Sequence, residues 1–279
     1  MPPTRARILL LTNDNFFSWC VLRDFLPARK EQIVGIVFSQ ALVGKKDMQS
    51  SLSWVLKNTG WRHFVFKSAV YGVFRVWNRL LALLGGRRWA SSTLLWTRRN
   101  GVRHWLSSNI NEPAFLDELR SLKPELIVSV SMNQVAKREL LKMPPLGCIN
   151  VHCAPLPRYA GMSPYVWALA NGEDYSAATI HYMEEGLDEG DILVQEKVPV
   201  RPGDSAFHLF WRCCARAGEL LETTVSEIES STQKSVPQDL SQRSYFSWPT
   251  PECVKSLRQR GYRLARTTDF LRAMFGGRA

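Results

Sequence analysis

Glycine is missing from the turn that follows the first apolar run of this 279-residue chain. Residues 6–14 read ARILLLTND, and the chain continues directly as NFFSW. A dinucleotide-binding loop needs glycines at this point, because its backbone amides must closely approach a pyrophosphate. The N-terminal pattern therefore predicts a buried strand followed by a helix, and it argues against a dinucleotide site there.

The cysteines of this chain lack the spacings that are typical of metal sites and disulfide frameworks. The six cysteines include no C-x-x-C pair and no spacing typical of metal ligands, and Cys213 and Cys214 are adjacent. We therefore expect reduced thiols, no metal site and a cytoplasmic location. The chain also lacks a run of about 18 uncharged apolar residues and a signal-peptide h-region, so we expect no transmembrane segment and no cleaved leader.

Acidic residues are almost missing from residues 41–106. This stretch holds twelve Lys and Arg against a single acid, Asp47, and this difference equals the formal net charge of +11. Outside it, 24 basic residues balance 24 acidic ones. Six of the ten tryptophans fall in the same stretch. We therefore predict a distinct basic and aromatic helical insertion over about residues 41–106.

One face of this insertion is expected to be apolar. Between residues 68 and 86, apolar side chains recur at spacings of four and three, which defines one helix face: Val70, Phe74, Trp77, Leu81 and Leu84. Such a helix can simply pack on the domain with its arginines in solvent. Arg and Trp also suit single-stranded nucleic acid, an anionic membrane surface or a phosphorylated acceptor. The sequence leaves these alternatives open.

The rest of the chain alternates between strand and helix patterns. We predict strands at 6–14, 32–40, 125–131 and 147–153, helices at 16–28, 112–124 and 163–172, a hairpin at 176–183 and 191–200, and a long helix at 202–230. Near-continuous apolar strands with helices between them favour a parallel sheet covered on both faces. The prediction is an α/β fold with a Rossmann-like, mostly parallel sheet.

The predicted domain boundaries and helix caps follow from the same patterns. We expect a catalytic domain over residues 1–232 and a short C-terminal extension over 233–279. For the helix at 163–172, Ser163 is the expected N-cap, with a proline at its first position and a glycine past its end. Asp204 is the expected N-cap of the long helix.

The stretch GCINVHCAPLPRYAG, residues 147–161, predicts an active site. Residues two apart on a strand share a face, so Asn150 and His152 should point the same way. The prolines that follow cannot extend the strand, which must end there. Ligands of open α/β sheets bind at the carboxyl ends of strands. Cys153 faces the opposite way, so a buried structural thiol is favoured over a nucleophile.

A second candidate feature is the acidic loop MEEGLDEGDILVQ, residues 183–195. Gly186 and Gly190 bracket a tight turn that would hold Asp188 between two strands. A solvated acidic turn is the alternative interpretation. The other histidines have no metal-ligand spacing, and we interpret them as surface or satisfied core residues: His63, His104, His181 and His208.

Together these motifs resemble the N-terminal catalytic domain of the formyltransferases that use 10-formyltetrahydrofolate. That family includes methionyl-tRNA, glycinamide ribonucleotide and sugar N-formyltransferases. The resemblance is strongest over residues 110–200, where Asn, His and Asp follow in the family's order and spacing, and it implies a catalytic triad of Asn150, His152 and Asp188. It also implies that the pterin of the folate lies against two segments: Met132, Asn133, Gln134 and Val135, and Glu184, Glu185 and Leu187.

The resemblance implies transfer of a formyl group to a primary amine. Asn150 would donate to the oxyanion, His152 would accept the amine proton, and Asp188 would fix the imidazole tautomer. The stretch SPYVWALANGE is most similar to the sugar-nucleotide N-formyltransferases, so a small anionic amine acceptor is expected. The alternatives are methionyl-tRNA, a hydroxyornithine-type amine, or a non-catalytic protein that binds nucleic acid or a membrane surface.

Overall fold

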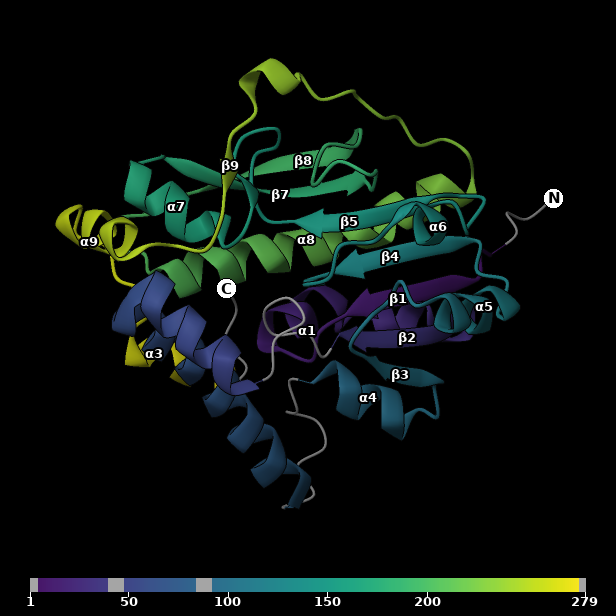
Figure 1. Ribbon diagram of the computed structural model, residues 1–279, viewed down its shortest axis with the longest axis horizontal. Helices are drawn as coiled ribbons and strands as arrows, with labels where there is room; N and C mark the ends of the chain where they lie inside the picture. Colours follow the sequence, from purple (N-terminus) through teal and green to yellow (C-terminus); the bar gives the residue numbers. More distant parts are fainter. Residues whose placement is uncertain (1–4, 40–47, 84–91, 276–279) are drawn as a thin grey trace.

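The computed structural model describes residues 5–39, 48–83 and 92–275. Its centre is a seven-stranded sheet in the order β3-β2-β1-β4-β5-β7-β8 (Figure 1). Neighbouring strands from β3 to β5 pair in parallel, whereas β7 pairs antiparallel with both β5 and β8. The predicted α/β fold with a mostly parallel sheet is confirmed. The strands of this sheet are β1 (Ile8–Thr12), β2 (Ile33–Ser39), β3 (His104–Ser107), β4 (Leu126–Val130), β5 (Cys148–His152), β7 (Tyr175–Tyr182) and β8 (Ile192–Pro199).

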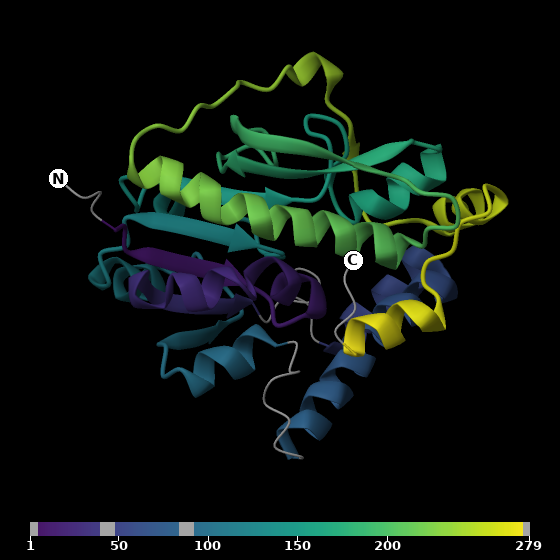
Figure 2. The same ribbon diagram turned by 180° about the vertical axis from the view of Figure 1, so that it is seen from behind.

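Helices cover both faces of the sheet, as the run of apolar residues in each parallel strand requires. Along β1, Ile8 and Leu10 enter the core on one face, and Leu9 and Leu11 enter the core on the other. The first core includes α1 (Phe16–Leu22), α2 (Phe25–Ala28), α7 (Pro164–Asn171) and the long α8 (Ala206–Glu229). The second includes α5 (Pro113–Ser121) and α6 (Arg138–Leu141), which lie behind the sheet in Figure 2.

The described part of the predicted basic insertion contains α3 (Met48–Leu83), whose helical backbone is broken by a kink at Gly60, and α4 (Thr93–Arg99). Val70, Phe74 and Leu81 of the predicted apolar face are buried in the core, and Trp77 is half-buried. Leu84 lies outside the described residues, as do the basic residues 45, 46, 87 and 88. Both views place α3 beyond the carboxyl ends of the parallel strands, the edge at which open α/β sheets bind ligands.

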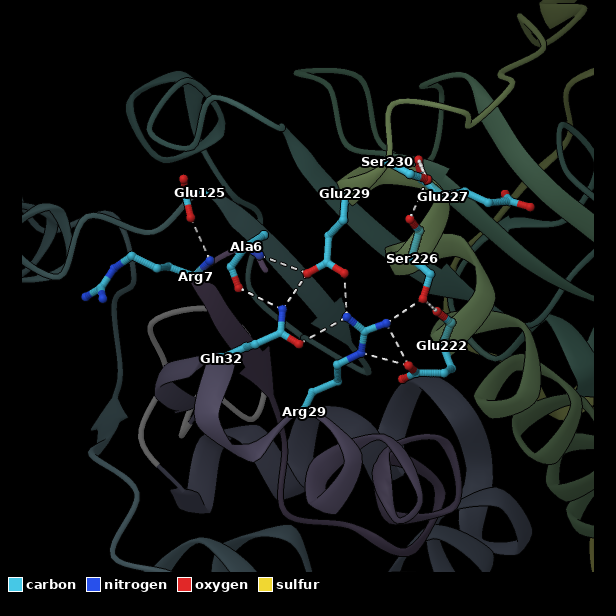
Figure 3. A network of polar contacts seen from close by, with 10 residues as sticks. All are labelled: Ala6, Arg7, Arg29, Gln32, Glu125, Glu222, Ser226, Glu227, Glu229 and Ser230. Atoms are coloured by element: carbon cyan, nitrogen blue, oxygen red, sulfur yellow. Dashed lines mark hydrogen bonds and ion pairs between the residues drawn. The ribbon is translucent and has the colours of Figure 1, made fainter. Parts of the chain in front are cut away.

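A buried polar network fixes the far end of α8 to the start of the sheet (Figure 3). Arg29 contacts Glu229 at 2.6 Å and donates from Nε to Glu222 at 2.7 Å, and both acids lie on α8. Glu229 also accepts the N–H of Ala6 at 2.8 Å, just before β1. Because this network sits at the amino ends of the strands, it braces α8 on the side opposite the expected site.

The two predicted helix caps differ from the observed ones in their details. Ser163 occupies the N-cap position of α7, but it has a φ of 52° and its side chain makes no capping bond. The N-cap of α8 is Ser205, whose hydroxyl accepts the N–H of His208 at 3.0 Å, so the prediction of Asp204 was wrong by one residue. Asp204 is instead buried as the ion-pair partner of Arg212. The hydroxyl of Ser205 caps α8, because the carboxylate of Asp204 is bound in the ion pair with Arg212.

The C-terminal part of the chain returns over the hairpin formed by β7 and β8 (Figure 1). We call residues 233–250 the strap. It runs from α8 to α9 (Pro251–Gln259) and includes the short strand β9 (Tyr245–Phe246), which pairs in parallel with β6 (Ala160–Gly161). The other short elements are η1 (Lys30–Gln32), η3 (Leu240–Gln242) and α10 (Thr267–Met274).

Candidate active site

Asn150 and His152 lie at the carboxyl end of β5, between a parallel neighbour and an antiparallel one. Val130 of β4 pairs with Val151, and Thr179 of β7 pairs with His152. The register places the two polar side chains on one face of the sheet, as their spacing predicts. Residues that follow β4 therefore lie beside His152, where a ligand in this edge of the sheet would contact both strands.

The tautomer of His152 is fixed by a backbone carbonyl. Its Nε2 lies 3.0 Å from the carbonyl oxygen of Tyr159, and because a carbonyl can only accept, Nε2 carries the proton. Nδ1 is left with a lone pair and faces Asp188 Oδ2 at 3.9 Å. The sequence-based expectation that Asp188 fixes the tautomer is wrong for this arrangement. Asp188 Oδ2 instead faces the ring nitrogen that carries no proton.

Asp188 is held inside the molecule at a tight turn. Its φ is 57°, and Oδ2 accepts the N–H of Gly161 at 2.9 Å. Its side chain is only 9% exposed, so the alternative of a solvated acidic turn does not hold for this residue. Gly161 has no room for a side chain, since an added Cβ would stand 2.3 Å from the carbonyl oxygen of Phe246. The missing side chain therefore allows the backbone N–H of Gly161 to reach the carboxylate of Asp188.

His181 completes the cluster, and the sequence did not single it out. It lies opposite Asn150 in the β5–β7 ladder. Its Nδ1 donates to the carbonyl of Tyr182 at 2.7 Å, which leaves Nε2 free to accept from Asn150 Nδ2 at 3.2 Å. Burial lowers its pKa to about 4 despite Asp188 nearby, with His152 contributing in the same direction. The neutral ring therefore orients the Asn150 amide and leaves the second N–H of Nδ2 available.

Comparison with known proteins identifies the family of the segment that contains this cluster. The model of the formyl transferase family matches residues 87–225. This segment belongs to that family. A methionyl-tRNA formyltransferase of Syntrophus aciditrophicus is 43% identical over 136 residues, which are 49% of this chain and 44% of that protein. Another, of Lachnospira eligens, is 40% identical over 146 residues, or 52% and 46% of the two chains. The chain thus matches about half the length of these curated relatives.

Solved structures share the fold at low sequence identity. An N-formyltransferase from Helicobacter canadensis, in complex with folinic acid and dTDP-3-aminofucose, has a TM-score of 0.58 and 18% identity, covering 87% of this chain and 71% of that one. Glycinamide ribonucleotide transformylase 1 from Symbiobacterium toebii has a TM-score of 0.55 and 17% identity, covering 84% and 94%. At these identities the likeness establishes the formyltransferase fold of the chain.

The segment predicted to receive the pterin of a formyltransferase is partly committed to the protein itself. Gln134 donates to Ser39 Oγ at 2.8 Å and to the carbonyl of Ser107 at 3.0 Å, and it accepts the N–H of Ile110 at 2.9 Å. Its side chain therefore joins the ends of β2, β3 and β4 and is not directed at a ligand. Within the described part of the chain, however, three backbone N–H groups lack an acceptor: those of Met132, Gln134 and Val135.

The residues predicted on the second side of the pterin belong to the Asp188 loop. Glu184 and Leu187 are exposed, and Glu185 lies 3.6 Å from Arg138 in an exposed ion pair. Met183, just before them, is tied to the sheet, since its N–H donates to the carbonyl of Cys148 at 2.7 Å. The loop is thus anchored at Met183 and at Asp188, with open side chains between these points.

The strap holds both loops of the candidate site, and no sequence pattern indicated this. Gln238 Nε2 donates to the carbonyls of Asp188 at 3.0 Å and Gly190 at 2.7 Å. Arg243 donates to the carbonyl of Leu187 at 3.1 Å. On the other side, Ser244 Oγ accepts at 2.9 Å the N–H of Tyr159, whose carbonyl orients His152. The strap therefore links the turn before Gly161 to the turn of Asp188.

The remaining candidates for site chemistry lie elsewhere or are absent from the described residues. Cys153 points into the core, with its Sγ 3.7 Å from that of Cys214, which agrees with a structural thiol. Residues 5–39, 48–83 and 92–275 contain no group of three or more His, Cys, Asp or Glu side chains that could hold a metal ion. In the same residues, no helix combines the length and apolar character needed to cross a membrane.

Proposed function

We propose that this protein transfers a formyl group from 10-formyltetrahydrofolate to the primary amine of a small anionic acceptor, such as an amino sugar nucleotide. One observation carries the proposal. Asn150, His152 and Asp188 come from a strand and from a loop 36 residues beyond it, and they converge at the carboxyl end of β5. This is the position at which open α/β sheets bind ligands.

The cluster supplies the groups that formyl transfer requires. The free N–H of Asn150 can donate to the formyl oxygen as negative charge develops there, a contribution of roughly 3 kcal/mol for a well-placed donor. His152 can accept the proton of the attacking amine at Nδ1. The resulting imidazolium is stabilised by Asp188 Oδ2, which lies 3.9 Å away, a distance that also accommodates a bridging water.

The chain offers fitting contacts for a reduced pterin between two segments. The N–H groups of Met132, Gln134 and Val135, which have no acceptor among the described residues, can donate to ring carbonyl and ring nitrogen acceptors. The loop from Glu184 to Leu187 would cover the other side. When bound, 10-formyltetrahydrofolate supplies the formyl group. The contribution of residue 134 is through its backbone, because its side chain is already hydrogen-bonded.

The anionic character of the acceptor is supported by the insertion. Helices α3 and α4 contain no acidic residue, and α3 lies beyond the carboxyl ends of the strands. The Helicobacter canadensis enzyme is in complex with an amino sugar nucleotide, dTDP-3-aminofucose, whereas the curated relatives are methionyl-tRNA formyltransferases. Formylation of methionyl-tRNA is therefore the second candidate, favoured by the identity over the matched half.

The test is release of tetrahydrofolate from 10-formyltetrahydrofolate in the presence of single acceptors. The panel contains dTDP- and UDP-linked amino sugars, an N-hydroxyornithine and methionyl-tRNA. We expect turnover with an amino sugar nucleotide and none with the His152→Ala variant. Turnover confined to methionyl-tRNA would select the second candidate. If no amine is formylated although a folate analogue raises the melting temperature, the proposed transfer is wrong and only folate binding remains.

A further inference from the structure

Helix α3 is apolar on the face that points away from the core as well as on the face that is buried. Its inner side chains, such as Phe66 and Val70, pack against the domain. The outer face of the helix that follows the break at Gly60 carries large hydrophobic residues exposed by 47% to 83%: Trp61, Val65, Val76, Leu80 and Leu83, with Tyr71 at its border. A surface helix of a globular protein normally presents polar side chains there.

The neighbouring helix α10 extends this surface. Leu271 and Phe275 are exposed, and a shallow groove between the two helices is lined only by apolar residues. The groove has a volume of about 410 Å³ and is formed by Gly72, Val73, Val76, Trp77, Leu80 and Met274. A contiguous exposed apolar patch of this kind marks an interaction site for a protein or a membrane.

The charges around the patch restrict which binding partner can cover it. Arg62, Arg75 and Arg79 are exposed on α3, Arg272 is exposed on α10, and α3 contains no acidic residue. A second copy of this chain would bring the same arginines together, which is unfavourable. Single-stranded nucleic acid stacks on exposed aromatic rings. This face exposes Trp61 and Tyr71, whereas the exposed side chains beside Arg75 and Arg79 are aliphatic: Val76, Leu80 and Leu83.

We propose that the outer face of α3, with α10, binds an anionic lipid bilayer, the helix lying in the interface plane. Val76, Leu80 and Leu83 would enter the boundary between head groups and acyl chains. The arginines would remain at the level of the anionic head groups. Trp61 lies at the same face, and tryptophan favours the interfacial region. The protein would thus bind the membrane surface peripherally, with the β5 site held close to it.

The experiment is flotation of the full-length protein with vesicles, in the absence of folate and acceptor. One set of vesicles is an equimolar mixture of phosphatidylglycerol and phosphatidylcholine, and the other is phosphatidylcholine alone. We expect binding to the first set and at least roughly tenfold weaker binding to the second. Because no formyl donor is present, the result is independent of the proposed enzymatic function.

Two variants test the two components of the surface. Val76→Asn/Leu80→Asn removes apolar contact, and Arg75→Gln/Arg79→Gln removes charge. Both sets of side chains are exposed, so the urea midpoint should be unchanged. Each should weaken binding to the anionic vesicles by roughly tenfold. The matched controls are Leu106→Asn/Leu240→Asn and Lys123→Gln/Lys142→Gln, which change exposed side chains elsewhere and should bind as the parent does.

Three outcomes would overturn the proposal. The first is equal binding of parent and variants, or no binding of the parent to anionic vesicles at low salt. The second is a lipid-free dimer, in sedimentation equilibrium, that only Val76→Asn/Leu80→Asn dissociates. The third is tight binding of mixed-sequence single-stranded RNA that displaces vesicles and is weakened by the arginine variant but not by the apolar one.

Discussion

The cluster at the end of β5 and the helix α3 each contain a buried histidine with a lowered pKa, His181 of β7 and His63, and the two differ in what surrounds their ring nitrogens. His181 is 2% exposed, and both its nitrogens are hydrogen-bonded. His63 on α3 is fully buried, and within the described residues neither of its nitrogens has a partner. Burial lowers the pKa of His63 to about 3, with Lys67 adding to this effect. The β5 end is organised by specific polar contacts, and α3 by apolar packing.

The largest expected effect is on the hydrogen-bonded cluster at β5. Loss of the imidazole in His152→Ala, or of the carboxylate in Asp188→Asn, should each lower kcat by at least about a hundredfold, because proton transfer from the amine loses its acceptor or its counter-charge. The measurement is tetrahydrofolate release at saturating acceptor. His104→Ala, which changes a histidine on the edge strand β3, is the control. A folded His152→Ala protein with near-normal kcat would contradict the mechanism.

His181 should act through Asn150 and not on the substrate. The change His181→Leu removes the acceptor that orients the amide, so we expect kcat to fall roughly tenfold with little change in KM. His181→Gln keeps an acceptor oxygen and should recover part of the loss. Since the pKa of His181 is about 4, its lone pair is available above that pH, and activity should decline as pH falls through about 4. A loss of stability without a kcat effect would assign a purely structural role.

The opposite result is expected for the buried histidine of α3. Replacing His63 by Leu removes a polar ring that has no hydrogen bond to the described residues, so the free energy of unfolding at pH 7 should rise by about 1 kcal/mol. The unfolded histidine binds a proton below its pKa of about 6.5, whereas the folded one does not until about 3. The unfolded state therefore binds more protons, and the parent loses stability as pH falls below about 6.5.

Urea unfolding at about pH 7 and about pH 5 measures both effects. The His63→Leu protein should show a shallower loss of stability between these values than the parent. His181→Leu is the matched comparison, because it also removes a buried titratable ring but leaves the Asn150 amide without its acceptor. If His63→Leu destabilises the protein at pH 7 as strongly as His181→Leu does, the contrast between the two regions is wrong.

The sequence predicted those parts of the molecule that depend on local patterns. The strand pattern and the i, i+2 spacing placed Asn150 and His152 on one face of β5, and the glycines around Asp188 predicted its turn. Partners brought together by tertiary structure could not be read in this way. His181 meets Asn150 only through the register of an antiparallel pair, and Gln238 reaches the Asp188 loop from 50 residues away. No period or spacing encodes such contacts.

The strap offers the smallest expected effect and the sharpest local comparison. Gln238 and Gln242 lie four residues apart in the strap. Gln238 donates to the loop of Asp188, whereas Gln242 donates to Asp239 within the strap at 2.8 Å. Gln238→Met keeps the length of the side chain and removes both donors. With each hydrogen bond worth about 1 kcal/mol net, the turn of Asp188 should loosen.

The consequence should appear in catalysis, because the proposed mechanism needs Asp188 beside His152 when the imidazole is charged. We expect Gln238→Met to lower kcat by roughly threefold to tenfold, since part of the lost hydrogen-bond energy is regained by water at the loop. Gln242→Met should leave kcat unchanged. Steady-state kinetics at saturating acceptor separate the two variants. Equal kinetics for both variants would mean that the contacts of Gly161, Arg243 and Met183 hold the loop without Gln238.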